Sequence, residues 1–282
     1  MVVEKLLMDI NGVICTMIKL NNKKVEFHHF NDGSCRFLCE PVSSANITWL
    51  YDNDEEIIQL YYLVSHLKAY KCAIELTMPY VNSARQDRVQ NKDDVFTLKY
   101  FCNLVNSLNM DKINIFDPHS RTTPALLNNV EVEMPTDIIM DLLKEHSKAI
   151  LCFPDIGAME KYSRYFNDDL FFAFGVKDRD WSSQKIKSLK IMGAKHMIAG
   201  HDILLCDDIV SRGSTIYLAA TQLKELGAKN IYVYVSHCEN TVLNHTETAT
   251  GLLDIPNLIT KLYTTNSIYR GNHPKIEVIK EF

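Results

Sequence analysis

The chain has 282 residues, of which 46% are hydrophobic and 23% are charged, a composition typical of a globular protein with one large or two ordinary domains. Its 35 acidic residues outnumber its 30 basic ones and give a net charge of −5. We therefore expect no nucleic-acid partner, because such proteins usually present a basic face. No run of about 18 apolar residues occurs, and no basic segment followed by an apolar stretch opens the chain, so we expect neither a membrane span nor a secretory signal.

The eight cysteines do not form a CxxC pair, and none has further Cys or His neighbours at the spacing of a zinc site. Several lie inside apolar runs, among them Cys152 and Cys206. This pattern predicts reduced, buried thiols in a cytoplasmic protein.

The first half of the chain alternates between short apolar runs ended by proline or Asp-Pro and longer segments with apolar residues at helical spacing. Two β-type segments joined by two asparagines at its start are typical of a hairpin. The predicted elements are a hairpin of Val13–Leu20 and Lys24–Phe30 turned by Asn21 and Asn22, a strand over Cys72–Met78, a helix over Asp94–Leu108, a strand over Lys112–Phe116, a helix over Pro135–Lys144 and a strand over Ala149–Phe153.

The second half repeats the alternation of apolar strands and amphipathic helices. Its central helix is followed by Gly227, and glycine is common just beyond the C-terminus of a helix. The predicted elements are a strand over Leu170–Phe174, a strand over Asp202–Cys206, a helix over Thr215–Leu226, a strand over Asn230–Ser236, a short helix over Thr246–Leu253 and a last core segment over Leu258–Thr264.

Strands that alternate with helices predict an α/β fold with mostly parallel sheets flanked by helices on both faces. Because the pattern runs twice, we expect an N-terminal domain over residues 1–145 and a C-terminal domain over residues 146–282. In such sheets ligands bind beyond the carboxyl ends of the strands. The polar segments that follow the predicted strands are therefore the places to look for chemistry.

The segment from Ile203 to Thr215 reads ILLCDDIVSRGST, an apolar strand followed by two acids, a short polar loop and a helix. A loop rich in Gly, Ser and Thr at a helix start offers backbone N–H and hydroxyl donors to a phosphate, and the helix dipole adds to this attraction. The paired carboxylates can accept hydrogen bonds from two ribose hydroxyls. The alternative is a capped helix after a strand, with a solvated acid pair.

This segment resembles the phosphoribosyl-binding motif of the type I phosphoribosyltransferase fold. The resemblance implies that this segment binds a ribose and its phosphate. It also predicts that the chain folds into two type I phosphoribosyltransferase-like domains. The residues expected to bind the acceptor are Asp207, Asp208, Ser211, Arg212, Gly213, Ser214 and Thr215.

The segment from Pro79 to Arg88, PYVNSARQDR, resembles the ATP-binding segment of the ribose-phosphate pyrophosphokinases, which ordinary phosphoribosyltransferases lack. Two guanidiniums around a Gln and an Asp suit a nucleotide, because arginine pairs with phosphate oxygens and glutamine offers both a donor and an acceptor. A solvated run of charges is the alternative. The residues expected to bind ATP here are Arg85, Gln86, Asp87 and Arg88.

Three further segments resemble motifs of the same family, in family order. IFDPHS, from Ile115 to Ser120, implies that His119 is a magnesium ligand, although magnesium prefers oxygen ligands. FPDIG places Asp155 at a second metal-associated carboxylate. FAFGVKDR places Lys177 and Arg179 at the lysine and arginine that stabilise the transferring phosphoryl groups.

Near the start, Phe30 to Gly33 resembles a hairpin that in the family reaches the adenine of a neighbouring subunit. By this resemblance Phe30 and Asp32 are expected to contact ATP, and the chain is expected to form a homodimer or a higher homo-oligomer. Ser34 stands where the family has glutamate, so adenine recognition is expected to differ.

Together these motifs resemble the ribose-phosphate pyrophosphokinase family. The resemblance implies a transferase that moves the β,γ-pyrophosphoryl group of ATP to the anomeric hydroxyl of ribose 5-phosphate with Mg²⁺ as cofactor, releasing AMP. The phosphate loop departs from the family pattern, because Ser211 replaces an acid, Arg212 adds a cation and Ser214 replaces a glycine.

Three alternatives remain open. The divergent loop fits a viral branch of the family, in which a relative acts on ADP-ribose in a NAD-rebuilding pathway and would work in the host cytoplasm. A phosphoribosyltransferase that uses an already activated ribose is disfavoured by Ala84–Asp87 and by Lys177 with Arg179. An inactive regulatory homologue is disfavoured because the chain keeps the expected catalytic charges.

Overall fold

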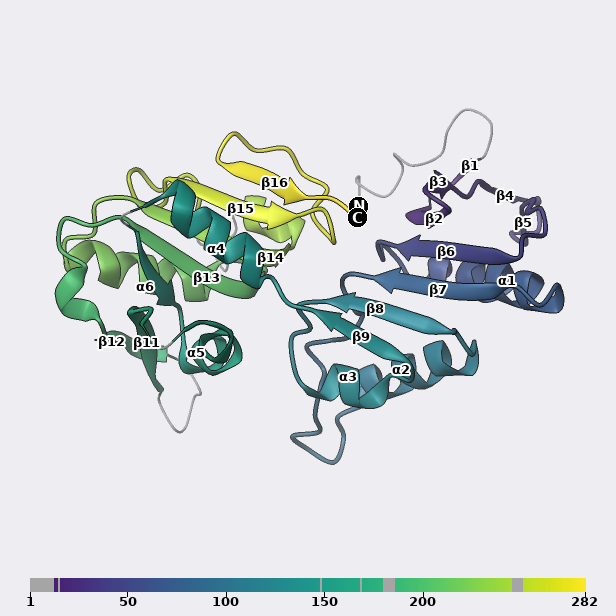
Figure 1. Ribbon diagram of the computed structural model, residues 1–282, viewed down its shortest axis with the longest axis horizontal. Helices are drawn as coiled ribbons and strands as arrows, with labels where there is room; N and C mark the ends of the chain where they lie inside the picture. Colours follow the sequence, from purple (N-terminus) through teal and green to yellow (C-terminus); the bar gives the residue numbers. More distant parts are fainter. Residues whose placement is uncertain (1–12, 15, 148, 168, 180–185, 245–250) are drawn as a thin grey trace. The chain divides into compact units, whose positions relative to one another are not determined.

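The computed structural model describes residues 13–14, 16–147, 149–167, 169–179, 186–244 and 251–282. It divides into two units, one comprising the residues up to Glu133 together with Phe282 and the other comprising Met134–Glu281 (Figure 1). Each unit has its own sheet and its own hydrophobic core, so each is described by itself. Most of the helix expected over Thr246–Leu253 lies outside the described residues.

The first unit is built on a six-stranded sheet of order β3-β2-β6-β7-β8-β9, in which β6 to β9 run parallel and β2 pairs antiparallel with both β3 and β6. Three short strands, β1, β4 and β5, form a separate antiparallel sheet. The strands are β1 (Val13–Ile14), β2 (Ile18–Leu20), β3 (Lys23–Lys24), β4 (Phe27–His29), β5 (Cys35–Arg36), β6 (Ser44–Trp49), β7 (Ala73–Met78), β8 (Lys112–Phe116) and β9 (Val130–Glu133), and the helices are α1 (Glu55–Ala69), α2 (Thr97–Ser107) and α3 (Thr122–Leu126).

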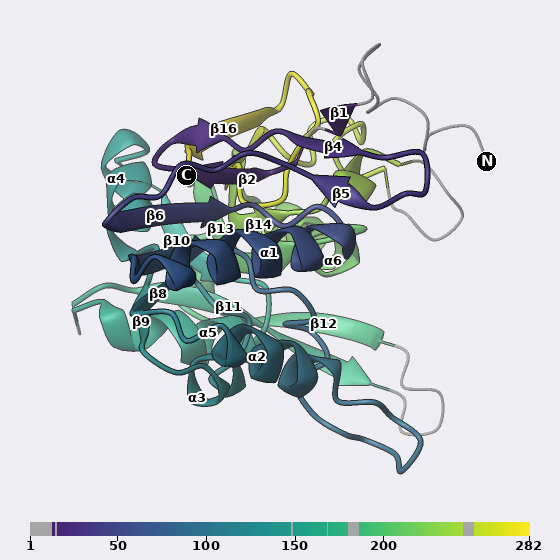
Figure 2. The same cartoon turned by 90° about the vertical axis from the view of Figure 1, so that its right-hand side faces the viewer.

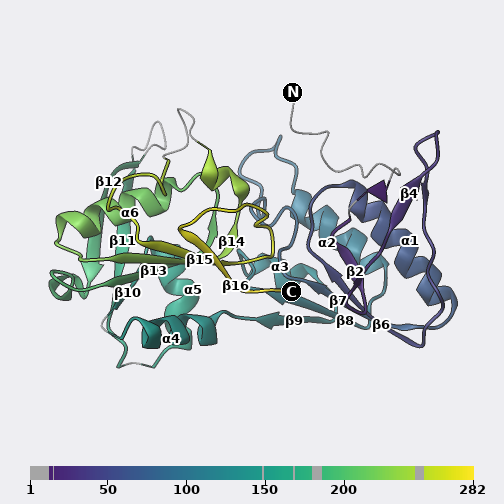
Figure 3. The same ribbon diagram turned by 90° about the horizontal axis from the view of Figure 1, so that it is seen from above.

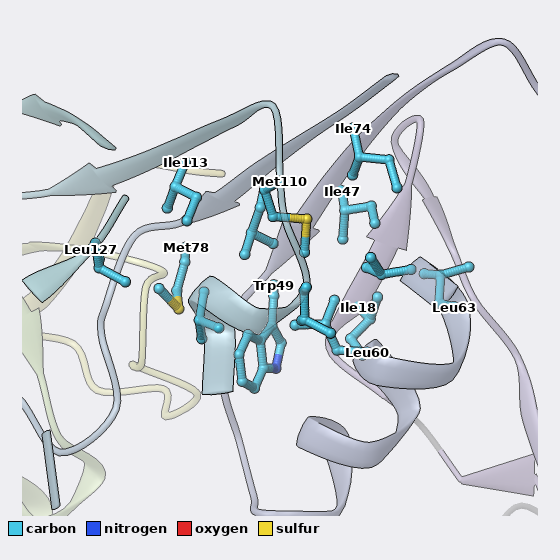
Figure 4. Packing of buried hydrophobic residues seen from close by; sticks show 14 of the residues in the cluster. Ile18, Ile47, Trp49, Leu60, Leu63, Ile74, Met78, Met110, Ile113 and Leu127 are labelled. Atoms are coloured by element: carbon cyan, nitrogen blue, oxygen red, sulfur yellow. The ribbon is translucent and has the colours of Figure 1, made fainter. Parts of the chain in front are cut away.

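Helices α1 and α2 lie on the same face of this sheet (Figure 2). Side chains at alternate strand positions point into a core that both helices cover, in which Trp49 of β6 and Leu60 and Leu63 of α1 belong to one cluster (Figure 4). Strands β6 and β7 are buried at every second residue, the period of a sheet with one buried face. The prediction that helices flank both faces of the sheet is therefore wrong for β6 and β7, which bury only one face.

The expected hairpin at the start is present, but it is shorter than predicted. Asn21 and Asn22 have φ values of 48° and 66°, the pair of positive values that a two-residue turn between twisted strands requires. Lys19 pairs with Lys24 across this turn. The chain then leaves the large sheet, and Phe27–His29 pairs instead in the small sheet, so one predicted strand serves two sheets.

The second unit is built on a seven-stranded sheet of order β12-β11-β10-β13-β14-β15-β16, parallel throughout except that β12 runs antiparallel to β11. The strands are β10 (Ile150–Phe153), β11 (Phe172–Arg179), β12 (Ile186–Gly193), β13 (Ile203–Val210), β14 (Ile231–Cys238), β15 (Lys261–Thr265) and β16 (Ile276–Lys280), and the helices are α4 (Thr136–Glu145), α5 (Ile156–Tyr162) and α6 (Ser214–Glu225).

Helices cover both faces of the second sheet, as predicted. In β13, Ile203 and Leu205 pack in the cluster that contains α6, whereas Leu204 and Cys206 pack in the cluster that contains α4 and α5. Figure 3 shows α6 and α4 on opposite sides of β13 and β15. A near-continuous apolar run such as the start of β13 is the expected sequence of a strand buried on both faces.

The boundary between the units falls one helix earlier than the expected division at residue 145. Helix α4, assigned to the first domain from the sequence, belongs to the second unit. Ile139 and Leu142 on its apolar face pack in one cluster with Leu151 and Phe153 of β10. Helical periodicity shows which face of a helix is buried, but it does not show which sheet covers that face.

Several elements differ from the sequence prediction. Strands β5, β6, β9, β12 and β16 and helices α1, α3 and α5 were not predicted, and β13 extends to Val210 instead of ending at Cys206. Among the described cysteines, none forms a disulfide. No helix among the described residues combines the length and the hydropathy that a bilayer crossing requires.

Candidate active site

The first part of the site joins the ends of β10 and β11. Asp155 follows β10 and caps α5, its Oδ1 accepting a hydrogen bond from the backbone N–H of Ala158 at 3.0 Å. Lys177 of β11 places Nζ 2.7 Å from Asp155 Oδ2 and 3.4 Å from Thr215 Oγ1, with only 11% of its side chain exposed. One buried ammonium thus lies between a carboxylate and the first turn of α6.

Gly175 makes this approach possible. A Cβ at this position would lie 2.4 Å from the carbonyl oxygen of Pro154, closer than atoms can pack. Only glycine lets β11 pass this close to the end of β10. The Phe153 and Phe174 pair sets the register that brings Lys177 to Asp155.

The second part of the site is the acid pair at the end of β13. Asp208 is buried, and its Oδ2 lies 3.1 Å from Lys161 Nζ of α5, in a pair whose side chains are only 8% and 15% exposed. Asp207 Oδ1 accepts the backbone N–H of Asp208 at 2.9 Å. Burial raises the pKa of Asp207 well above its usual range, and the neighbouring carboxylates of Asp208 and Asp155 raise it further.

The third part is the loop from Ser211 to the start of α6. Gly213 has a φ of 82° and precedes the first residue of the helix, so it adopts the left-handed conformation that favours glycine. The first N–H groups of a helix have no partner within the helix, and their dipoles attract an anion. Arg212 and Ser214 are exposed beside this helix start, and Ser211 and Thr215 are half-buried.

A buried polar network lies one strand away, between the ends of β14 and β15. Thr265 Oγ1 donates to the backbone carbonyl of Ser236 at 2.7 Å, and His237 Nδ1 lies 2.9 Å from Ser267 Oγ. All four of these side chains belong to residues that are buried. Ser267 lies just beyond β15, and the network joins this end of β15 to β14.

In the first unit, the expected ATP-binding residues follow β7 in a turn. Ser83 has a φ of 61° and its carbonyl accepts the N–H of Gln86 at 2.8 Å. Arg85, Gln86 and Arg88 are exposed, and Asp87 lies 3.4 Å from Arg88 Nε. The segment thus presents two guanidiniums to solvent beyond the carboxyl end of a parallel strand.

His119, the expected metal ligand of the first unit, lies half-buried between β8 and α3. The preceding Asp117 is buried and has a φ of 43°, so the chain turns sharply at the end of the strand. Asp155, the other expected ligand, belongs to the second unit. Among the described residues, no three His, Cys, Asp or Glu side chains converge on a common point that would hold a metal ion.

The Phe30 to Gly33 segment forms the turn between β4 and β5. The N–H of Phe30 donates to Ser34 O at 2.8 Å, and the Phe30 ring is 54% exposed. Hydrogen bonds from the side chain and backbone of Ser34 to Asp32 lower the pKa of Asp32. A cavity of about 680 Å³ opens beside this turn and is lined by Lys23, Lys24, His28 and Arg36 among other residues.

The structure brings together the residues predicted in the second unit. Lys177 contacts both Asp155 and Thr215. The side chain of Arg179 lies outside the described residues, although its backbone ends β11. The sequence analysis missed Lys161, because α5 was not predicted and no local pattern connects this lysine to Asp208.

Comparisons with known proteins show which sequences and folds this chain is similar to. Residues 136–249 match the family model described as a phosphoribosyl transferase domain. The chain is 27% identical over 224 residues to the ribose-phosphate pyrophosphokinase of Pyrococcus abyssi, covering 76% of this chain and 75% of that protein. It is 26% identical over 271 residues to ribose-phosphate pyrophosphokinase 2 of Enterococcus faecalis, covering 92% of this chain and 80% of that protein.

A solved structure shows the same fold over most of the chain. The phosphoribosylpyrophosphate synthetase from Mycobacterium smegmatis aligns with a TM-score of 0.73 at 20% identity, covering 90% of this chain and 85% of that chain. The expected α/β fold with type I phosphoribosyltransferase-like domains is therefore confirmed. The fold, the matched domain and the similarity to several pyrophosphokinases agree: the chain is similar, at modest identity, to the ribose-phosphate pyrophosphokinases, which are transferase enzymes.

Proposed function

We propose that the protein transfers the β,γ-pyrophosphoryl group of ATP to the anomeric hydroxyl of a ribose-5-phosphate-type acceptor and releases AMP. The observation that supports this most directly is the contact of Lys177 with both Asp155 and Thr215. A largely buried cation between this carboxylate and the start of α6 would stabilise the negative charge that develops on a transferring phosphoryl group.

Each part of the site has a role in this proposal. The first N–H groups of α6 hold the phosphate of the acceptor. Asp207 and Asp208 accept hydrogen bonds from the ribose hydroxyls, and the Lys161 ion pair holds Asp208 in place. Lys177 and Arg179 stabilise the charge on the transferring group, and Arg85 with Arg88 hold the nucleotide.

In the reaction, the anomeric oxygen of the acceptor attacks the β-phosphorus of ATP in line. A bond forms between that oxygen and the β-phosphorus, the bond from the β-phosphorus to the bridging oxygen of the α-phosphate breaks, and AMP leaves with the electron pair. The proton of the hydroxyl passes to solvent. Because positioned charges supply most of the stabilisation, we expect no covalent enzyme intermediate.

Magnesium suits the chemistry of the second unit. Asp155 offers an oxygen ligand of the kind that Mg²⁺ prefers, and the carboxylates of Asp207 and Asp208 lie near it. Bound there or at His119, Mg²⁺ would neutralise phosphate charge. Since no full ligand cage occurs among the described residues, substrate phosphates and water would complete the coordination.

The proposal is tested by identifying the nucleotide product. Purified protein is incubated with ATP, Mg²⁺ and ribose 5-phosphate, and the products are separated by ion-exchange chromatography. We expect AMP and a pyrophosphorylated sugar, formed only when all three components are present. ADP with a monophosphorylated sugar would contradict the proposal, and consumption of an activated ribose without ATP would favour a phosphoribosyltransferase.

ADP-ribose is the second acceptor worth testing, because the loop that would close on a terminal phosphate carries the exposed Arg212. An open pocket would admit a diphosphate linked to a second nucleoside, and Arg212 would meet the added charge or stack on the second base. Equal concentrations of ribose 5-phosphate and ADP-ribose compete in one assay, and the products are resolved by mass. Exclusive formation of the small product would exclude the enlarged pocket.

We also propose that the active form is a homodimer or a higher homo-oligomer. The support is the exposed Phe30 ring at the tip of a turn whose shape is fixed by its own hydrogen bonds. Light scattering gives the mass in solution under assay conditions. A fully active monomer would contradict this part of the proposal.

A further inference from the structure

The side chain of Ser211, at the start of the phosphate loop, is bound to a carboxylate from a different strand. Ser211 Oγ donates a hydrogen bond to Glu239 Oε2 at 2.6 Å. Thr241 Oγ1 donates to the same oxygen at 3.0 Å and lies 3.3 Å from Ser211 Oγ. One carboxylate oxygen therefore holds two hydroxyls that belong to two loops.

The register of the sheet explains this contact. Strands β13 and β14 are parallel and pair Val210 with Cys238, their last residues. The backbone N–H of Glu239 donates to Val210 O at 2.9 Å, which continues the ladder by one bond. The first residues beyond the two strands, Ser211 and Glu239, therefore meet, and the following 3₁₀ turn (Asn240–Leu243) brings Thr241 to them.

The contact fixes the direction in which both hydroxyls can bond. A hydroxyl has one proton, and the protons of Ser211 and Thr241 are both donated to Glu239. Their oxygens can then only accept, so their side chains cannot donate to a phosphate while Glu239 is ionised. Of the backbone and hydroxyl donors expected in this loop, the backbone N–H groups at the start of α6 are therefore the ones we expect to hold the phosphate.

We propose that Glu239 is a positioning and specificity-determining residue for the acceptor, an inference that rests on the proposed function. It supplies a carboxylate to a loop that has serine at its first position, and it orients Ser211 and Thr241 to accept a hydrogen bond from a sugar hydroxyl. Its negative charge keeps the acceptor phosphate at the helix start, away from Ser211.

The first test measures Glu239→Gln, which keeps the size of the side chain and removes its charge. We expect the KM for ribose 5-phosphate to rise about 10-fold, the size of one hydrogen bond to a charged group, with the KM for ATP and kcat changed less than about 2-fold. Glu225→Gln, a change at an exposed glutamate at the end of α6, is the matched control. Equal KM values in the two variants would overturn the proposal.

The second test moves the carboxylate from position 239 to position 211, the two positions that the hydrogen bond joins. Ser211→Asp alone places two carboxylates in contact, so the KM for ribose 5-phosphate should rise. Ser211→Asp combined with Glu239→Gln restores a single charge and should recover most of the lost affinity. A purely structural role for Glu239 predicts no recovery, and a double variant as weak as the worse single variant would overturn the proposal.

A third measurement separates this inference from the proposed function. If the wild-type protein releases no AMP with either acceptor, the proposed function fails. Hydrogen exchange of the unliganded protein then decides the role of Glu239, because peptides that cover residues 206–217 should exchange several-fold faster in Glu239→Gln. The double variant should return this exchange toward that of the wild type, and unchanged exchange in Glu239→Gln would overturn the proposal.

Discussion

The two units present their expected functional residues in opposite ways. In the second unit, cations and carboxylates are paired and largely buried, as in the contacts of Lys177 with Asp155 and of Lys161 with Asp208. In the first unit, Arg85 and Arg88 of the nucleotide segment are exposed in a turn. The paired side chains of the second unit are held in place before any ligand binds, whereas the arginine side chains of the first unit are exposed to solvent.

This difference follows from how each segment is held. The paired residues of the second unit lie on or next to β10, β11, β13 and α5, elements whose buried side chains pack in the core, so their directions are fixed by that core. Fixed charges stabilise a transition state without a cost of rearrangement at the moment of reaction. Exposed arginines on a turn can bind phosphate strongly, but they lose side-chain entropy when they do so. Mutations in the two units should therefore have different consequences.

The largest expected effect is on catalysis at Lys177. Lys177→Ala removes the largely buried cation, and we expect kcat for AMP release to fall about 100-fold or more, with a smaller change in the KM for ATP. The family resemblance predicts the same for Arg179→Ala. Lys195→Ala, at an exposed residue of the same unit, is the control. Near-full turnover by Lys177→Ala would show that the buried cation of the second unit is not needed for catalysis.

The next effect is on stability at Lys161. Lys161→Met removes the cation beside the buried Asp208, and we expect unfolding free energy to fall by about 3 kcal/mol, because an uncompensated buried charge is costly. The control is Lys144→Met, whose partner Asp141 is 73% exposed, and which should not change stability measurably. Urea denaturation followed by circular dichroism measures both. Equal unfolding free energies for the two variants would show that the Lys161 ion pair with Asp208 does not stabilise the fold.

A moderate effect is expected on nucleotide binding in the first unit. Arg85→Ala and Arg88→Ala should each raise the KM for ATP about 10-fold, the value of a charge-assisted hydrogen bond to phosphate. Because both side chains are exposed, the thermal midpoint should not change. Arg164→Ala, at an exposed arginine of the second unit, serves as the control in the same assay. A fall in stability would mean that these arginines support the fold.

The smallest expected effect is a higher thermal midpoint at pH 8 when Asp207 is replaced by asparagine. Its pKa in the folded protein is raised above the ordinary value of 3.8, so the folded state binds the proton more tightly than the unfolded state does. Stability then falls as pH rises from about 4 through the raised pKa. Asp207→Asn removes this dependence, and its thermal midpoint without ligands should exceed that of the wild type at pH 8, the difference shrinking toward pH 4.

Activity provides the second readout for Asp207. The variant should release AMP more slowly, because a neutral amide accepts the ribose hydroxyls and any Mg²⁺ less well. Added Mg²⁺ should stabilise the wild type more than the variant. A midpoint that is unchanged or lower at pH 8 would mean that burial and the neighbouring carboxylates of Asp208 and Asp155 do not destabilise ionised Asp207 in the folded protein.

Much of the site could be predicted because its residues lie in short continuous segments. Asp155, Lys177 and the loop from Ser211 to Thr215 each follow or end an apolar strand, and the carboxyl ends of parallel strands meet at one edge of a sheet. Lys161 and Glu239 could not be found in this way. Each contacts its partner only through a helix or a strand register that local composition does not specify.

The amino-acid sequence by itself determined the alternation of strands and helices, the polar segments at the strand ends and the two asparagines of the first hairpin, because these depend on local periodicity and on backbone preferences. Only the tertiary structure decided that α4 belongs with the second sheet, that β12 lies beside β11 and that Ser211 donates a hydrogen bond to Glu239. Those choices depend on which apolar faces bury each other and on which strands share a register, and both are properties of residues far apart in the chain.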